Sequence, residues 1–277
     1  MHRIGIIQGR LSPLINGKIQ AFPLKFWKQE FPILKECGFD VLEWVFDSVD
    51  TDQNPILSVQ GRKEICSLKK EFQIEIPSVC SDYFMEVPLL SKEKEIDRKS
   101  FQILEQIIPV CPEVGIQFVE LPLIGALSVK EEKAQNGMKK ILEKLFPGIK
   151  RNKIKILLEF DAPPPTIAEF LKGMPEFIQV NYDTGNSAYW QFDVDEEMKS
   201  YGHKIGSVHI KDCTPKDYSV LLGKGNVDFD KTFKLLKENN YAGDFILQTV
   251  RSDNHMQAAL EFKNFTKNFV KKYFHGS

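Results

Sequence analysis

The sequence predicts an α/β fold, a single (β/α)8 barrel domain that spans residues 1–277. Short apolar runs alternate with helical patterns along the chain, and these runs are rich in β-branched and aromatic residues. Several runs are apolar at successive positions, as in parallel strands that are covered on both faces. Eight strands that alternate with helices over roughly 250 residues are typical of a closed barrel. The strands are expected at Arg3–Ile7, Asp40–Trp44, Ile74–Val79, Ile116–Leu121, Ile154–Phe160, Phe177–Tyr182, Ile205–Ile210 and Asp244–Thr249.

The segments between these runs have the spacing of amphipathic helices that cover a sheet. In four of them, apolar residues recur every three or four positions along the chain. These sets are Ile65, Leu68 and Phe72; Phe101, Leu104 and Ile108; Met138, Ile141, Leu142 and Leu145; and Phe229, Phe233 and Leu236.

The last segment carries a longer apolar set between Met256 and Val270, with most of its lysines at other positions. A basic helix on a membrane surface would have the same pattern. Every preceding strand needs a helix to cover its outer face, however, so a helix packed on the barrel is favoured.

An open, doubly wound sheet is the alternative fold. It is disfavoured because no GxGxxG motif follows the first strand, and Gly223-Lys224-Gly225 comes late and after no strand. The densest proline cluster, Pro163-Pro164-Pro165, directly follows a strand and is typical of a loop between a strand and a helix. With no linker rich in Pro, Gly or Ser, the chain is expected to form one domain.

Composition excludes several classes of function. The 37 basic and 38 acidic residues give a net charge of −1, so nucleic acid is not expected as a partner. No apolar run reaches the roughly 18 residues of a membrane span. The start, Met1-His2-Arg3, does not resemble a signal peptide. Five scattered cysteines without a CxxC pair are expected to be reduced thiols of a cytoplasmic protein.

Polar residues end four consecutive strands, where a barrel of this type gathers its chemistry. Glu159 ends the fifth strand, Asp183 follows the sixth, His209 lies in the seventh and Gln248 ends the eighth. Each has an ordinary structural interpretation on its own, such as a helix cap or a buried hydrogen bond. Together, two carboxylates, an imidazole and an amide oxygen suit one divalent cation, namely Mn²⁺, Mg²⁺, Co²⁺ or Zn²⁺.

Further polar residues are candidates for binding a substrate. Glu43 and Glu120 lie near the ends of the second and fourth strands, where they would bind sugar hydroxyls or act as acid/base groups. Lys211 and Arg251 would hold a phosphate or carboxylate as fixed positive charges. Gln8 follows the first strand and would line the pocket from the far side.

Several stretches resemble the xylose isomerase-like TIM barrels, a group of sugar isomerases and epimerases that also contains the endonuclease IV type of DNA-repair enzyme. The resemblance covers essentially the whole chain, and the order of the stretches is its strongest part. They are Ile4–Leu11, Gly38–Trp44, Phe118–Leu123, Glu159, Tyr182–Asn186, Val208–Asp212 and Gly223–Phe229.

The resemblance implies metal ligands at Glu159, Asp183, His209 and the place held by Gln248. In sugar 3-epimerases of this group, glutamates on the fifth and eighth strands are also opposed acid/base groups. Gln248 departs from this pattern: its amide oxygen can bind a cation, but it cannot exchange a proton at a useful pKa. One-base aldose–ketose isomerisation is less affected, because Glu159 alone could carry a proton on one face of an enediolate.

The leading hypothesis is therefore a metal-dependent isomerase or epimerase of a small sugar or related polyhydroxy carbonyl compound, with Glu159 as the catalytic residue. The alternatives are a non-catalytic metal- or sugar-binding barrel and an endonuclease IV-like phosphodiesterase. The latter is disfavoured because the chain has few histidines and near-neutral charge. The sequence leaves the oligomeric state open, homo-oligomers included.

Overall fold

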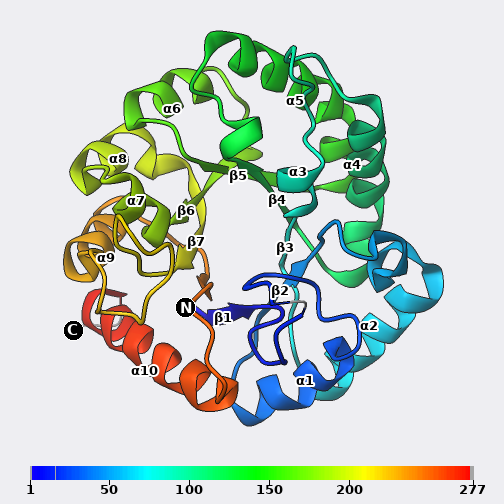
Figure 1. Cartoon of the computed structure of the whole chain (residues 1–277), viewed down its shortest axis with the longest axis vertical. Helices are drawn as coiled ribbons and strands as arrows, with labels where there is room; N and C mark the ends of the chain where they lie inside the picture. The colour runs from blue at the N-terminus through cyan, green and yellow to red at the C-terminus, as the bar shows by residue number, and fades with distance from the viewer. Residues whose placement is uncertain (1, 16, 275–277) are drawn as a thin grey trace.

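The computed structural model describes residues 2–15 and 17–274. Eight parallel strands close into a barrel in chain order, with helices around it (Figure 1). Closure occurs where β1 pairs with both β2 and β8, so the predicted (β/α)8 fold is confirmed. The strands are β1 (Ile4–Ile7), β2 (Leu42–Val45), β3 (Ser78–Cys80), β4 (Phe118–Leu123), β5 (Lys155–Phe160), β6 (Ile178–Asp183), β7 (Ile205–Ile210) and β8 (Phe245–Leu247).

The main helices follow the strands as the apolar periodicity predicts. They are α1 (Trp27–Glu36), α2 (Val59–Phe72), α3 (Tyr83–Glu86), α4 (Arg98–Val110), α5 (Glu132–Asn152), α6 (Pro164–Leu171), α7 (Thr184–Trp190), α8 (Val194–Tyr201), α9 (Phe229–Glu238) and α10 (His255–Phe274). Short 3₁₀ turns lie at η1 (Thr51–Gln53), η2 (Pro55–Leu57), η3 (Cys111–Val114), η4 (Gly125–Leu127) and η5 (Gly202–Lys204).

Closure of the barrel requires a small residue in β1. A Cβ atom on Gly5 would lie 2.7 Å from Cγ1 of Val41 and 2.8 Å from Cδ1 of Ile246. Val41 directly precedes β2, and Ile246 lies in β8. Glycine therefore lets the first strand fit between β2 and β8.

Several strands differ from their predicted bounds at the ends that face the site: β2 ends at Val45, β4 at Leu123 and β6 at Asp183, each later than predicted, and β3 and β8 differ as well. The run expected at Ile74–Val79 forms a strand only from Ser78, because Pro77 has no N–H to donate to a neighbouring strand. That strand also extends to Cys80. The last strand ends at Leu247, so Gln248 follows the strand, although its backbone N–H still donates to the carbonyl of Ile210 at 3.1 Å.

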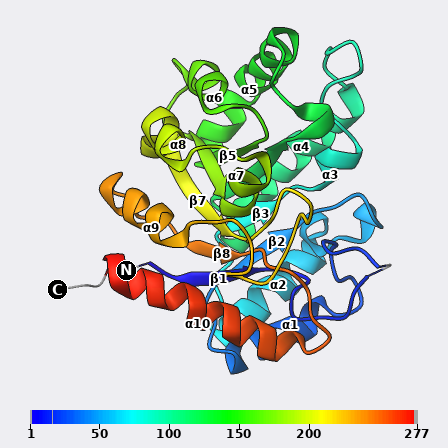
Figure 2. The same ribbon diagram turned by 60° about the vertical axis from the view of Figure 1, so that its left-hand side comes forward.

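The final helix packs on the barrel, as predicted. Ala259, Phe262, Thr266 and Val270 on α10 are buried. Figure 2 shows α10 lying along the outside of the barrel beside β1. Among residues 2–15 and 17–274, no helix has both the length and the apolar character that crossing a bilayer requires.

Aromatic rings fill the space between β8 and its covering helices. Phe233 of α9 is fully buried and stacks on Phe245 of β8 with ring centroids 4.8 Å apart. The ring of Phe269 in α10 also stacks on Phe233, with ring centroids 5.2 Å apart. This cluster joins α9, α10 and the closing strand of the barrel.

We expect Phe233→Ala to lower the free energy of unfolding by about 3–5 kcal/mol, the usual cost of truncating a buried aromatic residue. Urea denaturation would measure this loss. Leu260→Ala, on the exposed side of α10, is the matched control and should change stability by less than about 1 kcal/mol. Equal effects of the two substitutions would mean that the aromatic cluster does not anchor α9 to the barrel.

Candidate active site at the carboxyl end of the barrel

The centre of the site is the imidazole of His209, which is fully buried in β7. Its Nε2 atom lies 2.7 Å from Oε2 of Glu43 and 3.5 Å from Oε2 of Glu120. Its Nδ1 atom lies 3.7 Å from Oε2 of Glu159. Burial opposes the charged imidazole, but the carboxylates, Glu43 first, raise the pKa of His209 to about 9.

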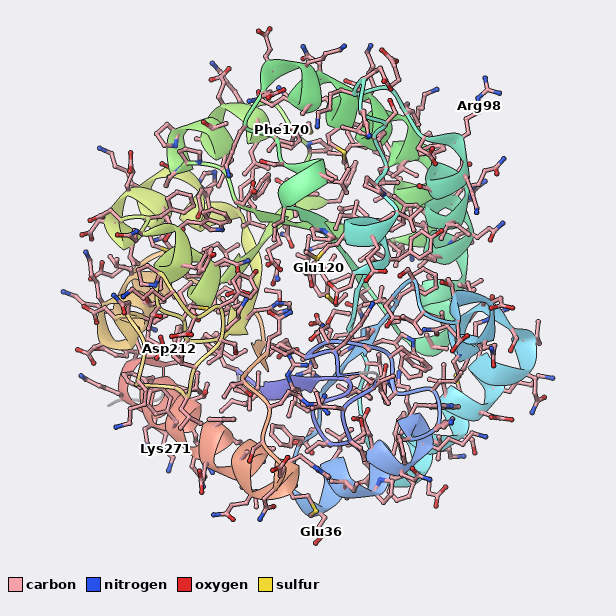
Figure 3. The ribbon with its side chains drawn as sticks, viewed as in Figure 1. Glu36, Arg98, Glu120, Phe170, Asp212 and Lys271 are labelled. Carbon is pink, nitrogen blue, oxygen red and sulfur yellow. The ribbon has the colours of Figure 1, made fainter. Side chains whose placement is uncertain are left out.

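The carboxylates around His209 are also buried, and they lie inside the ring of strands. Figure 3 shows Glu120 near the middle of this ring, whereas Glu36, Arg98 and Lys271 lie on the outside. Burial, followed by the charge of Glu159, raises the pKa of Glu120 well above its ordinary value. Burial and the charge of Asp183 raise the pKa of Glu159 as well. The site therefore concentrates acidic groups at low dielectric, where they bind protons or cations strongly.

Glu159 is oriented by two amides. Asn181 of β6 donates from Nδ2 to Oε2 of Glu159 at 3.0 Å, and Asn186 of α7 donates from Nδ2 to Oε1. Pairing of β6 with β7 sets Asp183 beside His209. One oxygen of Asp183, Oδ1, accepts the backbone N–H of Asn186 at 2.9 Å and so caps α7.

Lys211 supplies a buried positive charge beside the carboxylates. Its Nζ atom lies 3.5 Å from Oδ2 of Asp183, donates to Oδ1 of Asn186 at 3.1 Å and lies 3.6 Å from the centre of the Tyr218 ring. Burial lowers the pKa of Lys211, but Asp183 and other acidic groups outweigh this effect and raise it. The ammonium group therefore stays charged. A Cβ on Gly185 would lie 2.6 Å from Cγ of Lys211, so glycine makes room for this side chain.

The late Gly223-Lys224-Gly225 motif has a structural role. The loop after β7 folds around Asp212, whose Oδ2 atom accepts the backbone N–H groups of Gly223 at 2.8 Å and Gly225 at 2.9 Å. The same loop carries Tyr218, whose hydroxyl donates to Oδ1 of Asn186 at 2.7 Å. Asp212 therefore holds the loop that covers Lys211.

The structure offers two groups that could hold a cation. In each group, one ligand atom per residue lies within 4.8 Å of the others. In the first, Glu43, Glu120 and His209, the Nε2 atom is already bound to Glu43, which also accepts the Ser78 hydroxyl at 2.6 Å. In the second, Glu159, Asp183 and His209, two buried atoms, Oδ2 of Asp183 and Nδ1 of His209, have no hydrogen-bond partner, and in the first the Oε2 atom of Glu120 has none. The donor set and these two atoms fit a divalent cation in the second group.

Gln248 lies beside this second group. It is half-buried and lines a cavity of about 190 Å³ together with Glu159 and Lys211. Other side chains of the cavity wall are Arg10, Ile19, Gln20, Asp82, Met85, Pro122, Ile124, Tyr218 and Ser219. Glu43 and Glu120 contact His209 and are not among the described residues that line this cavity.

Two expected substrate-binding residues make contacts within the chain. Gln8 is fully buried, and its Oε1 atom accepts the backbone N–H of Val45 at 3.1 Å. Arg251 donates to the carbonyls of Gly9 and Ser12 and so holds the loop after β1. Among the described residues that line the cavity, neither Gln8 nor Arg251 is present.

The structure brings in residues that sequence reasoning passed over. Asn181 and Asn186 orient Glu159, and Tyr218 covers Lys211 from a loop far along the chain. Asp82 follows the third strand and lines the cavity. The sequence could have indicated Asp82, because it is the first carboxylate after that strand. The strand was expected to end at Val79, however, and Asp82 was not considered. The amide roles required the three-dimensional pairing of β6 with β5 and α7.

A (β/α)8 barrel with a buried Glu/Asp/His cluster at the carboxyl ends of its strands defines a class of proteins that includes metal-dependent enzymes. The sequence profile of the xylose isomerase-like TIM barrel family matches residues 31–267. Because this match covers most of the chain, the protein belongs to that family.

Known proteins show the same likeness. L-Ribulose-5-phosphate 3-epimerase UlaE of Escherichia coli K12 is 25% identical over 238 residues, which cover 80% of this chain and 81% of that protein. The IOLI protein with a bound zinc atom superposes with a TM-score of 0.75 at 16% identity, covering 98% and 99% of the two chains. A Mycobacterium smegmatis xylose isomerase-like TIM barrel protein in complex with magnesium gives 0.70 at 17% identity over 98% and 97%. The structural matches establish the shared fold.

A buried carboxylate of the next helix, α8, accepts a hydrogen bond from α7, the helix that carries Asn186. Glu197 of α8 accepts three hydroxyls, from Tyr182 at 3.0 Å, Ser187 at 2.5 Å and Tyr201 at 2.8 Å. Burial raises the pKa of Glu197 to about 7, although the hydroxyls that donate to it act in the opposite direction. The contacts fix α7 against β6 and α8.

We expect Glu197→Gln to reduce the pH dependence of stability. The pKa of Glu197 is raised in the fold from an ordinary value of 4.5 to about 7. Its contribution to stability is therefore complete below about pH 4.5 and is lost as the pH rises through 7. Urea denaturation at pH 5 and pH 8 should show a difference between the two pH values that is about 2 kcal/mol smaller in the variant. Glu196→Gln, at an exposed neighbouring position, is the control, and equal pH dependence in both variants would contradict the assignment.

Proposed function

We propose that the protein is a divalent-metal-dependent epimerase or isomerase of a small phosphorylated ketose, with Glu159, Asp183, His209 and Gln248 as metal ligands. The observation that carries the proposal is a pair of buried ligand atoms without hydrogen-bond partners, Oδ2 of Asp183 and Nδ1 of His209, beside the cavity that Glu159 lines. The relation to an L-ribulose-5-phosphate 3-epimerase over 80% of this chain supports the sugar substrate.

The cavity also has the charge that such a substrate needs. Lys211 lines it and stays positively charged, and Arg10 is also among the residues that line it. These groups suit the phosphate of a pentulose 5-phosphate. The volume of about 190 Å³ accommodates the part of a small sugar that reaches the carboxylates.

The chemistry is proton transfer next to a carbonyl group. A bound divalent cation would polarise the carbonyl and the neighbouring hydroxyl oxygen. Glu159 removes the proton from the carbon next to the carbonyl, and the electron pair moves into an enediolate. Asn181 and Asn186 hold the Glu159 carboxylate in place during this transfer. Tyr218 and Lys211 cover the site on the side of the loop after β7.

Neither alternative function has comparable support. A DNA-repair phosphodiesterase of the endonuclease IV type uses several histidines, whereas the two candidate metal groups of the described chain share one, His209. A non-catalytic barrel would not need Glu159 to be oriented by two amides. A catalytic assay of Glu159 separates this last alternative from the proposal.

We expect Glu159→Gln to lower turnover by about 10²–10⁴-fold, the usual contribution of an acid/base group. The assay follows deuterium entry next to the carbonyl of L-ribulose 5-phosphate in D₂O with Mn²⁺, using NMR. Glu169→Gln, on the exposed side of α6, is the matched control and should retain wild-type activity. The proposal fails if the wild-type protein exchanges no deuterium with phosphorylated or free ketopentoses in the presence of Mn²⁺, Mg²⁺, Co²⁺ or Zn²⁺.

We expect Gln248→Glu to tighten Mn²⁺ binding by about tenfold or more, because a carboxylate adds a negative charge to the ligand set. Isothermal titration calorimetry with Mn²⁺ alone would measure this change. Gln257→Glu adds the same charge at an exposed position of α10 and should leave the affinity unchanged. Identical affinities of the wild type and Gln248→Glu would place Gln248 outside the metal site.

A further inference from the structure

Gln248 replaces the eighth-strand glutamate of the family pattern, so this chain lacks the second acid/base group at that position. Inversion at carbon requires a second group on the face that Glu159 does not serve, and the amide of Gln248 cannot exchange the proton. Any replacement must be a titratable side chain that lines the same cavity. Of the described titratable residues in the cavity wall, Arg10 donates to backbone carbonyls, and Lys211 and Tyr218 both donate to Asn186; the carboxylates are Glu159 and Asp82.

We propose that Asp82 is this second acid/base residue, which exchanges a proton with the substrate face opposite to Glu159. The assignment rests on the proposed function and makes the reaction an epimerisation. Asp82 follows β3, whereas Glu159 belongs to β5, and Pro122 of the intervening strand β4 lines the wall with them. The two carboxylates therefore reach the cavity from different sides of Pro122.

Asp82 differs from four other aspartates that precede α-helices in this fold. Its side chain makes no capping hydrogen bond to α3, although it stands at the N-cap position of that helix. Four other aspartates at N-caps do accept backbone N–H groups of the helices that follow them. They are Asp97, Asp183, Asp193 and Asp228.

The remaining contacts of Asp82 leave its carboxyl group available. Oδ1 accepts a hydrogen bond from the thiol of Cys80 at 3.4 Å, and a thiol is a weak donor. Burial raises the pKa of Asp82, while Cys80, Gln20 and the charges of His209 and Arg10 lower it. A carboxyl with a raised pKa holds a proton more readily for donation.

A purely structural role for Asp82 would be to balance the charge of Arg10. The buried Arg10 guanidinium already donates to the carbonyls of Thr249 at 2.8 Å and Ile19 at 2.9 Å. Burial and the charge of Arg251 lower the pKa of Arg10, and the opposing effect of Asp82 is smaller than either. The structural role and the catalytic role therefore predict different effects of removing the carboxylate.

The proposed reaction conserves atoms and electrons. The carboxylate of Glu159 takes the proton from the carbon next to the carbonyl, and the C–H electron pair forms the C=C bond of an enediolate. The protonated Asp82 then gives its proton to the same carbon from the other face, as the C=C bond returns to a C=O bond. Glu159 ends protonated and Asp82 ionised, and exchange with water restores both groups. The reverse reaction uses the two residues in opposite roles.

The test compares the wild-type protein with Asp82→Asn in D₂O with Mn²⁺, starting separately from L-ribulose 5-phosphate and from its 3-epimer. In Asp82→Asn, formation of the opposite epimer should fall by about 10²-fold or more, as for loss of an acid/base group. Deuterium should still enter one of the two epimers, the one that Glu159 deprotonates, at a rate within about tenfold of the wild type. Asp82→Ser should give the same pattern.

The controls separate catalysis from folding. Asp193→Asn removes another N-cap carboxylate, at an exposed position outside the cavity, and should retain full epimerisation. Mn²⁺ affinity and thermal unfolding of Asp82→Asn should match those of the wild type.

Two results would overturn the assignment while leaving the proposed function intact: Asp82→Asn and Asp82→Ser epimerise like the wild type, or they lose deuterium exchange of both epimers along with inversion. A wild-type protein that exchanges no deuterium removes the proposed function and the assignment together.

Discussion

The site depends on one electrostatic constraint: an imidazole and several carboxylates share a buried space at the centre of the barrel. His209 contacts Glu43 at 2.7 Å and lies near Glu120 and Glu159, all of them nearly or completely buried. Carboxylates that are close together in a low dielectric cannot all stay ionised without positive partners. His209 and Lys211 supply part of the compensating charge, and a proton on Glu120, whose pKa is strongly raised, removes another part of the repulsion.

The remaining negative charge is concentrated where ligand atoms lack partners. Glu43 accepts the Ser78 hydroxyl and contacts His209, so groups within the chain already stabilise its negative charge. Glu159 is held by amides, which can orient a carboxylate but carry no net charge. Asp183 accepts a backbone N–H of α7 with one oxygen and lies 3.5 Å from Nζ of Lys211 with the other. This uncompensated negative charge on rigid elements supports the proposed cation site.

The sequence predicted the barrel well because a parallel barrel imposes a simple pattern on every strand. Runs such as Ile154–Phe160 must be apolar on both faces, and the residues that end them face one rim, which is why Glu159, Asp183 and His209 could be grouped before the structure was known. The residues that hydrogen-bond to these strand-end side chains were not predictable in the same way. Asn181 donates to Glu159 across a strand pair, and the Oε1 atom of Gln8 accepts the backbone N–H of Val45 in β2, although Gln8 follows the first strand as a pocket residue would. Such contacts depend on side-chain direction and not on spacing.

The amide at position 248 fits the same electrostatic constraint. A glutamate there would add a further carboxylate to a cavity wall that already contains Glu159 and Asp82. The pKa values of both these carboxyl groups are already raised. Glutamine keeps an oxygen available for a cation while avoiding that repulsion. Under the proposed function, a second acid/base group would have to come from another part of the wall, and the charge of Arg10 lowers the pKa of the Asp82 carboxyl there, against the effect of burial. The proposed role of Asp82 after β3 and the amide at position 248 after β8 are therefore both consistent with a limit on the negative charge of this cavity wall.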